Sequence, residues 1–174
     1  MARVATVIAD LFEDVEYTSP EKALLDANHE VVTVGFEGGM GASVEGKHGA
    51  KVDVQHSIAD VSPDDFDALF IPGGFSPDIL RADDRMVAFA KAFMDAKKPV
   101  FAICHGPQLL ITARTLEGRD VTGYKSIQVD LENARANFHD QEVVVCQNQL
   151  VTSRTPDDLP AFNREMVKML VLGH

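Results

Sequence analysis

Short apolar segments that alternate with helical ones constrain the fold of this chain most strongly. Runs rich in β-branched residues predict buried strands at Arg3 to Ala9, Glu30 to Phe36, Phe66 to Ile71 and Pro99 to Ile103. Between the last two runs, the apolar residues of Asp83 to Ala96 recur with a helical period. Strands that alternate with helices predict an α/β fold with a mostly parallel sheet covered on both faces.

The remaining segments fit the same plan. The Gly35 to Gly46 region together with Lys51 to Val54 indicates a turn or hairpin extension, and Val143 to Val151 indicates a strand or a hairpin around Asn148. Further helices are expected around Ala23 to Ala27, at Pro107 to Ala113 and at Asp157 to Leu172. The chain contains no internal repeat or linker, so we expect a single domain over residues 1–174.

Charge and cysteine content narrow the function classes. The formal net charge is −11 with no long basic run, so the surface should repel phosphate backbones and anionic lipids. We therefore expect no direct nucleic-acid or membrane binding. No apolar stretch approaches the roughly 18 residues of a membrane span, and Met1 to Ala9 is too short for a secretion signal. The 2 cysteines form no disulfide framework, which favours a cytoplasmic setting.

Chemically active side chains follow several of the predicted strands. They lie in a predicted acidic loop from Asp10 to Glu16, in Pro72 to Asp78 and in Cys104 to Gly106. In open parallel sheets the site lies beyond the carboxyl ends of the strands. These segments are therefore the candidates for a common site.

Cys104 is the strongest candidate for a catalytic residue. Ala102 and Gly106 place small residues two before and two after it, which is the spacing of a nucleophile elbow at a strand-to-helix turn. The following helix N-terminus would stabilise a thiolate. The alternative is a buried cysteine that acts as a small hydrophobic residue, and this interpretation suits Cys146, which lies within an apolar strand.

The two other segments supply candidate partners. Glycines at Gly73 and Gly74 let backbone N–H groups approach a ligand, so the N–H groups of Gly74 and His105 could face an oxyanion; an ordinary tight turn is the alternative. An acid of the segment Glu13 to Glu16 could hold a proton beside the thiol, although a solvated acidic loop is the commoner explanation of such a charge cluster.

Cofactor and metal signatures are absent from the sequence. The acidic segment after the first strand lacks a G-x-G-x-x-G motif and would repel a pyrophosphate, so no dinucleotide cofactor is expected. The histidines other than His105 are scattered and have no zinc-site spacing, so no metal is expected; they are His29, His48, His56, His139 and His174.

Motifs along nearly the whole chain resemble the ThiJ/PfpI (DJ-one) superfamily, in particular its PfpI-type intracellular protease and general stress protein branch. The resemblance rests on segments 12–16, 46–49, 71–74, 102–107 and 152–159. It implies a flavodoxin-like three-layer sandwich related to class I glutamine amidotransferases, assembled as a homodimer or higher homo-oligomer. Amidotransferase activity itself is rejected because the C-terminal segment lacks the histidine and glutamate pair that this activity needs.

The resemblance also assigns roles to individual residues. It implies that Cys104 is the nucleophile, that His105 is its adjacent histidine and that Glu16 hydrogen-bonds the thiol, with Glu13 as a partner in the same motif. The oxyanion donors correspond to Gly74 and His105 through their backbones, with Gly73 and Tyr124 near the substrate. The position of the acid that a neighbouring subunit contributes to a Cys-His-acid triad corresponds to Asp78, where the branch carries a longer glutamate.

The same residues are compatible with three different functions. The first is a stress-protective enzyme that attacks small reactive carbonyls or glycated substrates without a cofactor, of the glyoxalase or deglycase type. An intracellular cysteine peptidase would use the same residues. A redox sensor or chaperone, with Cys104 oxidised and no turnover, is an alternative from another class.

Overall fold

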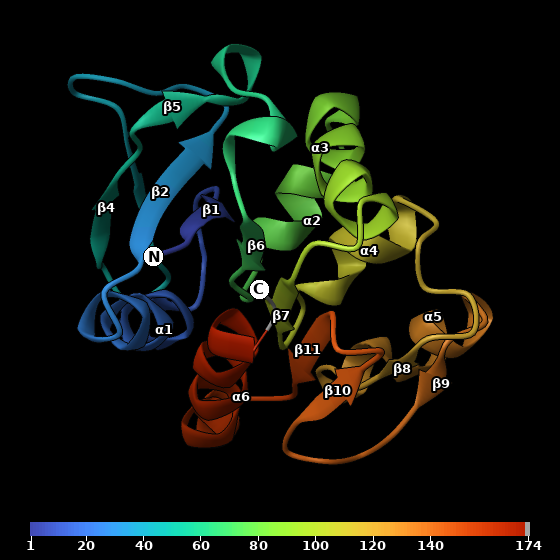
Figure 1. The fold of residues 1–174 in the computed structure, drawn as a ribbon. Helices are drawn as coiled ribbons and strands as arrows, with labels where there is room; N and C mark the ends of the chain where they lie inside the picture. The colour runs from blue at the N-terminus through green and yellow to red at the C-terminus, as the bar shows by residue number, and fades with distance from the viewer. Residues whose placement is uncertain (173–174) are drawn as a thin grey trace.

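The computed structural model describes residues 1–172, so His174 lies outside the described part of the chain. A seven-stranded sheet with the order β10-β11-β7-β6-β1-β2-β5 forms the centre (Figure 1). Its strands are β1 (Arg3–Val7), β2 (Glu30–Gly35), β5 (His56–Ser57), β6 (Ala68–Ile71), β7 (Val100–Ile103), β10 (Val144–Cys146) and β11 (Leu150–Ser153). Every neighbouring pair is parallel except β10 and β11, so the predicted mostly parallel sheet is confirmed.

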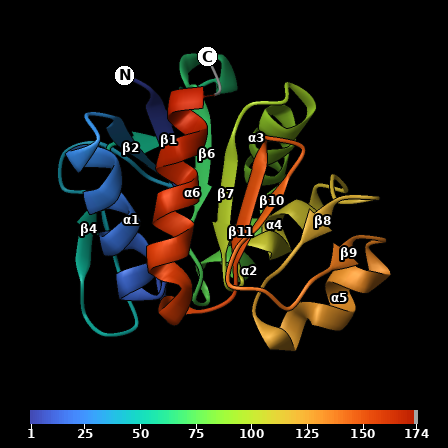
Figure 2. The same ribbon diagram turned by 60° about the horizontal axis from the view of Figure 1, so that its bottom comes forward.

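Helices cover the sheet on both faces (Figures 1 and 2). One face carries α1 (Asp14–Asp26) and α6 (Leu159–Leu172), and the other carries α2 (Ser76–Arg81), α3 (Asp84–Asp95) and α4 (Pro107–Thr112). Beyond the β10 edge lie α5 (Gln128–Asn133) and a small sheet of β8 (Asp120–Val121) and β9 (Asn137–Phe138). Short 3-10 helices span Ile58–Asp60, Pro63–Asp65, Lys125–Ile127 and Pro156–Asp158. This is the predicted three-layer α/β arrangement.

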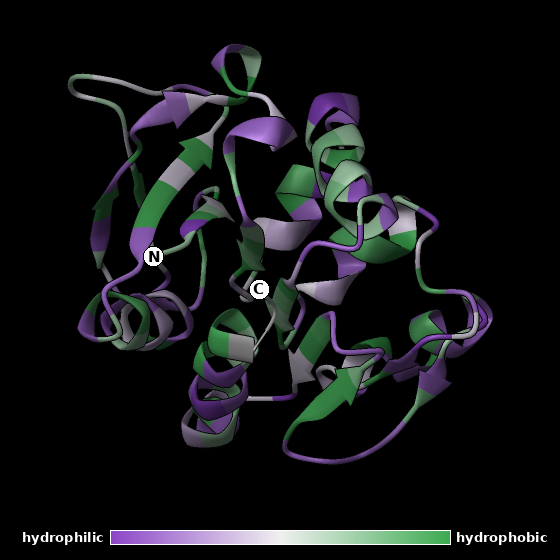
Figure 3. Cartoon of the chain, in the orientation of Figure 1, coloured by the Kyte–Doolittle hydropathy of each residue, from purple (hydrophilic) through white to green (hydrophobic). Residues whose placement is uncertain are grey.

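Alternation along the central strands divides the core into two parts. On β7, Val100 and Ala102 pack with the α2–α4 layer, whereas Phe101 and Ile103 pack with the layer that contains Phe162 of α6. Both faces of the strand are buried, which is why the strand reads as a continuous apolar run rather than an alternating one. Figure 3 shows the same distribution, with hydrophobic segments along the central strands and hydrophilic ones on much of the periphery.

In both segments where a hairpin is one of the predicted alternatives, the structure has a hairpin. Strands β3 (Ser43–Glu45) and β4 (Lys51–Asp53) are antiparallel, and so are β10 and β11. The second hairpin turns through Gln147 and Asn148, with φ angles of 53° and 57°. Positive φ at both central residues is the backbone pattern of a type I′ turn, whose twist matches that of the flanking strands.

The prediction of an acidic loop from Asp10 to Glu16 is wrong in its second half. Helix α1 begins at Asp14, so Glu16 lies in a helical first turn, where carboxylates are favoured by the helix dipole. Likewise, the segment from Pro72 continues into α2 at Ser76, so Asp78 is helical. None of the described helices is long and apolar enough to span a bilayer.

Candidate active site

The loops that follow β1, β6 and β7 meet at the carboxyl edge of the sheet around one cavity. Its volume is about 620 Å³. It is lined by Glu13, Glu16, Lys47, Gly74, Phe75, Asp78, Cys104, His105, Gln108, Tyr124 and Pro156. The cavity therefore brings together every predicted site residue except Gly73, which lies directly against Glu16 and Cys104.

Cys104 occupies a strained turn between β7 and α4. Its φ is 63°, a left-handed conformation that non-glycine residues rarely adopt. A Cβ on Gly106 would come within 2.6 Å of the Ile71 carbonyl oxygen, so this position requires glycine. The Cys104 N–H donates to the Ser153 carbonyl at 2.9 Å, and the Cys104 carbonyl accepts from the Tyr124 N–H at 2.8 Å. These contacts hold the sulfur at the floor of the cavity, where the residue is 7% exposed.

Glu16 is the buried acid of the site. Helix α1 buries it completely, and neither carboxyl oxygen has a hydrogen-bond partner of regular geometry among the described residues. Burial and the nearby charge of Glu13 raise the pKa of Glu16 to about 8, while the Cys104 thiol, the Lys47 charge and the Gly73 backbone oppose the increase. Glu16 is therefore predominantly a neutral carboxylic acid at pH 7 and can donate a proton.

Gly73 makes room for this contact. A Cβ at Gly73 would overlap the Glu16 carboxyl oxygen and would lie 2.7 Å from the Cys104 Cβ. The same loop is fixed to the start of α1, because the Glu13 N–H donates to the Gly73 carbonyl at 3.2 Å. The glycine thus allows acid and thiol to approach each other.

The Cys104 thiol has a raised pKa, contrary to the expectation of a thiolate stabilised by the helix N-terminus. Burial is the largest cause, and the Glu16 carboxylate is the second. The backbone N–H groups of Gly74 and His105 act as donors toward the sulfur and oppose the increase. Because Glu16 and Cys104 interact strongly, their protons belong to the pair. Once the pair has lost one proton, a thiolate beside a protonated Glu16 is its nucleophilic form.

His105 lies beside the sulfur and is held by two neighbours. Its Nδ1 is 3.4 Å from Cys104 Sγ and its Nε2 is 3.2 Å from the Ser126 hydroxyl oxygen; which nitrogen carries the proton depends on the tautomer. The ring stacks on Tyr124 with 4.8 Å between centroids. Burial and the Lys47 charge lower the pKa of His105, whereas Asp78 of the same chain raises it. His105 is thus a neutral imidazole at pH 7.

Lys47 also lines the cavity and brings a positive charge to it. The sequence motifs did not predict this residue as part of the site. Its Nζ is 3.0 Å from Glu13 Oε2, and Glu13 Oε1 is 3.3 Å from His48 Nε2. The β3–β4 loop carries Lys47 to this place, because Asp14 accepts from the N–H groups of His48 and Ala50. The only sequence signal was the segment 46–49 in the family resemblance.

Ser126 and Gln108 are further polar residues near the site that the sequence did not indicate. Ser126 contacts His105, and Gln108 lines the cavity with its buried Oε1 unpartnered among the described residues. Cys146 lies on the edge strand β10, which β11 separates from the strand that leads to Cys104. Its sulfur accepts from Arg119 Nε at 3.2 Å. Within residues 1–172, no group of three acidic, histidine or cysteine side chains is arranged to hold a metal ion.

Comparison with known proteins relates this geometry to described sequences and structures. Residues 2–169 match the sequence model of the DJ-1/PfpI family. General stress protein 18 of Bacillus subtilis is 63% identical over 169 residues, covering 97% of both chains. Protein/nucleic acid deglycase 2 of Escherichia coli is 55% identical over 169 residues, again covering 97% of both.

A solved structure extends the similarity to the fold. A two-domain protein from Anabaena variabilis, with DJ-1/ThiJ/PfpI-like and ferritin-like domains, superposes with a TM-score of 0.93 at 35% identity. The match covers 98% of the present chain and 48% of that protein. The similarity therefore concerns one part of that longer chain.

Proposed function

Because this chain belongs to the DJ-1/PfpI family, we propose that it is a stress-protective, cysteine-dependent enzyme that acts on reactive carbonyls and their adducts. The observation that carries the proposal is the buried pair of Cys104 and Glu16. Burial raises the pKa of Glu16 to about 8, so a proton donor lies against the nucleophile at neutral pH. The names of the relatives, general stress protein 18 and protein/nucleic acid deglycase 2, support this class of function.

The first step is addition of the Cys104 thiolate to an aldehyde carbon. An S–C bond forms, the π electrons of the carbonyl move to its oxygen, and this oxygen takes the proton of Glu16. The N–H groups of Gly74 and His105, which point toward the sulfur, would stabilise the developing oxyanion. Preorganised backbone donors of this kind need no rearrangement during the reaction.

The following steps convert a ketoaldehyde such as methylglyoxal into lactate. The Glu16 carboxylate takes the hydrogen on the first carbon as a proton and returns it to the second carbon, while the hydroxyl proton moves to the ketone oxygen. The first carbon is thereby oxidised to a thioester and the second is reduced to an alcohol, so no external oxidant is needed. Water hydrolyses the thioester and restores the thiol. In an amine or thiol adduct the first carbon carries a hydroxyl group and the amine or thiol, so its C–N or C–S bond breaks as the S–C bond to Cys104 forms, and Glu16 gives its proton to the departing amine or thiol.

A cysteine peptidase is the second candidate, and the position of His105 favours it. A neutral imidazole 3.4 Å from the sulfur can take the thiol proton, and Asp78 lines the same cavity. A third candidate is a redox sensor or chaperone without turnover, in which a peroxide would oxidise Cys104.

Lactate formation from methylglyoxal tests the proposal. Wild type should produce lactate, Cys104→Ala and Glu16→Gln should lose this activity, and Cys146→Ala should retain it as the matched cysteine control. A wild type that leaves dicarbonyls unchanged but cleaves a peptide would establish the peptidase. If neither substrate is turned over and peroxide adds oxygen selectively at Cys104, the sensor is correct.

A further inference from the structure

A second cavity adjoins the candidate active site. It has a volume of about 570 Å³ and is lined by Gly123, Tyr124, Lys125, Gln128, Phe138, Asp140, Arg154 and Thr155. Tyr124 lines both cavities, and the successive residues Thr155 and Pro156 line one cavity each. The two cavities therefore share a wall, whose central residue stacks on His105.

The combined space exceeds what a free dicarbonyl requires. Each cavity alone has the size of about 300–1,000 Å³ that is typical of sites for drug-sized ligands. A three-carbon ketoaldehyde bound to Cys104 would leave the second cavity empty. A ligand that extends past Tyr124 would use both.

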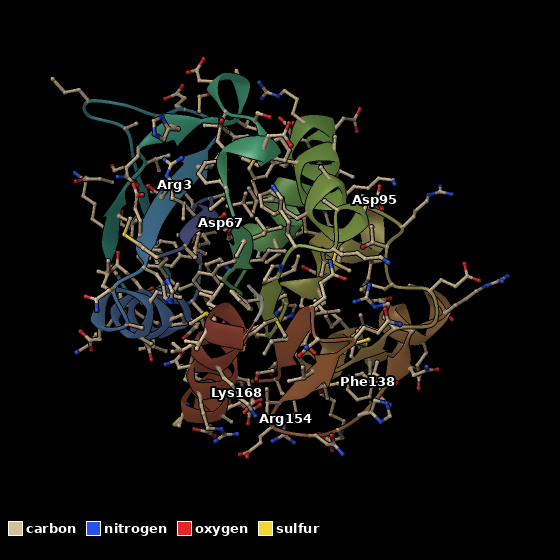
Figure 4. All side chains as sticks on the ribbon, viewed as in Figure 1. Arg3, Asp67, Asp95, Phe138, Arg154 and Lys168 are labelled. Atoms are coloured by element: carbon tan, nitrogen blue, oxygen red, sulfur yellow. The ribbon has the colours of Figure 1, made fainter. Side chains whose placement is uncertain are left out.

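The second cavity is lined by an ion-paired arginine, an aromatic ring and a lysine. This combination favours a polar chain with one negative charge. Arg154 is fully engaged, because its guanidinium contacts Asp140 at 2.9 Å and Asp158 at 3.0 Å. Phe138 is half-buried and gives the cavity an apolar part; Figure 4 labels it together with Arg154.

Lys125 is the available cation of this cavity. It is exposed and takes part in none of the ion pairs found within residues 1–172. One unpaired ammonium group suits one carboxylate. A polyanion would instead meet a chain with a net charge of −11, which disfavours nucleic acid as the occupant.

We propose that this second cavity binds the polypeptide that carries the carbonyl adduct, and that Lys125 selects peptides with an acidic residue next to the modified one. The inference rests on the proposed function, because it assumes that the adduct reacts at Cys104. What it adds to the proposed function is a subsite for the peptide and a residue, Lys125, that selects among modified peptides.

Two matched peptides test the selection. They carry the same methylglyoxal-modified cysteine and differ only in the next residue, which is aspartate or lysine. For wild type, kcat/KM for lactate release should be about 1.5- to 5-fold higher with the acidic peptide, the range of an exposed ion pair. Lys125→Glu should reverse the preference. If the dicarbonyl were first released into solution, any difference between the peptides would be the same for wild type and Lys125→Glu.

Lys168→Glu is the matched control, since it changes the net charge equally from an exposed position on α6 (Figure 4). It should leave the preference unchanged, and neither variant should alter methylglyoxal turnover by more than about twofold. Equal kcat/KM values for both peptides in wild type, or a preference that survives Lys125→Glu, would overturn the inference. Turnover of a glycated oligonucleotide that falls in Lys125→Glu, without any peptide preference, would identify nucleic acid as the occupant instead.

Calorimetric binding to Cys104→Ala separates this inference from the proposed function. The unmodified acidic peptide should bind more tightly than the basic one, and Lys125→Glu in the same background should reverse the order. A wild type without activity on methylglyoxal refutes the proposed function, whereas these affinities still decide whether the cavity binds peptides. Equal affinities refute the peptide site even if the enzyme is active.

Discussion

Replacing Glu16 with glutamine should change how the stability of this protein depends on pH. Burial raises the pKa of Glu16 from an ordinary 4.5 to about 8. The folded state therefore binds this proton more tightly than the unfolded state does. Folding stability from this group is fully present below pH 4.5, falls as the pH rises, and levels off above pH 8.

The size of the effect follows from the two pKa values. Each pH unit between them corresponds to 1.36 kcal/mol, so complete ionisation of Glu16 costs about 5 kcal/mol. Between pH 5 and pH 8 the wild type should lose about 3–4 kcal/mol of unfolding free energy relative to Glu16→Gln. This is a large part of the roughly 5–15 kcal/mol that stabilises an ordinary domain.

Urea unfolding of both proteins at several pH values between 5 and 8 measures this difference. Other titrating groups are common to both proteins and largely cancel in the comparison. Glu37→Gln removes a carboxylate from an exposed position and should follow the wild-type curve. Parallel curves for wild type and Glu16→Gln would refute the assignment of Glu16 as a buried neutral acid.

Other substitutions test separate parts of the structure. Gly73→Ala should lower the unfolding free energy by about 1–3 kcal/mol in urea, because the new Cβ overlaps the Glu16 carboxyl; unchanged stability would contradict the close approach. Cys146→Ala should cost about 1–3 kcal/mol by removing the buried sulfur that accepts from Arg119 Nε and from the Asp120 N–H, yet retain lactate formation. Asp78→Asn should lower the pKa of His105 in an NMR titration, since the Asp78 carboxylate raises it; an increase would exclude this electrostatic contact.

Local sequence predicted most of the sheet because its strands are buried on both faces. Continuous apolar runs such as Pro99 to Ile103 therefore coincide with strands, here β7. The weakly patterned elements were not predicted: β5, β8 and β9 are only two residues each. Short elements of this kind depend on neighbours that are distant in sequence, such as the pairing of Asp120 with Asn137.

The N-terminal boundary of α1 shows why the acidic segment was misassigned. Its carboxylates resemble a solvated loop in sequence, but they occupy a helix start, where Asp14 holds the β3–β4 loop and Glu16 enters the core. Glu13 and Glu16 are three residues apart, so they lie on the same side of the helix start and both reach the cavity. The helical period therefore directs Glu13 and Glu16 to the cavity and Asp14 to the β3–β4 loop, a distinction that the acidic composition alone does not make.

The sequence by itself determined which reactive residues follow which strands. A cysteine between small residues follows one strand, and glycines and acids follow two others. These features are local, because a tight turn constrains its own neighbours. Only the tertiary structure decided that Glu16 is completely buried beside the thiol, that Lys47 and Ser126 reach the same site, and that the pKa of Cys104 is raised. Burial and contact depend on segments distant in the chain, and the energy of a charge depends on how much water those segments exclude.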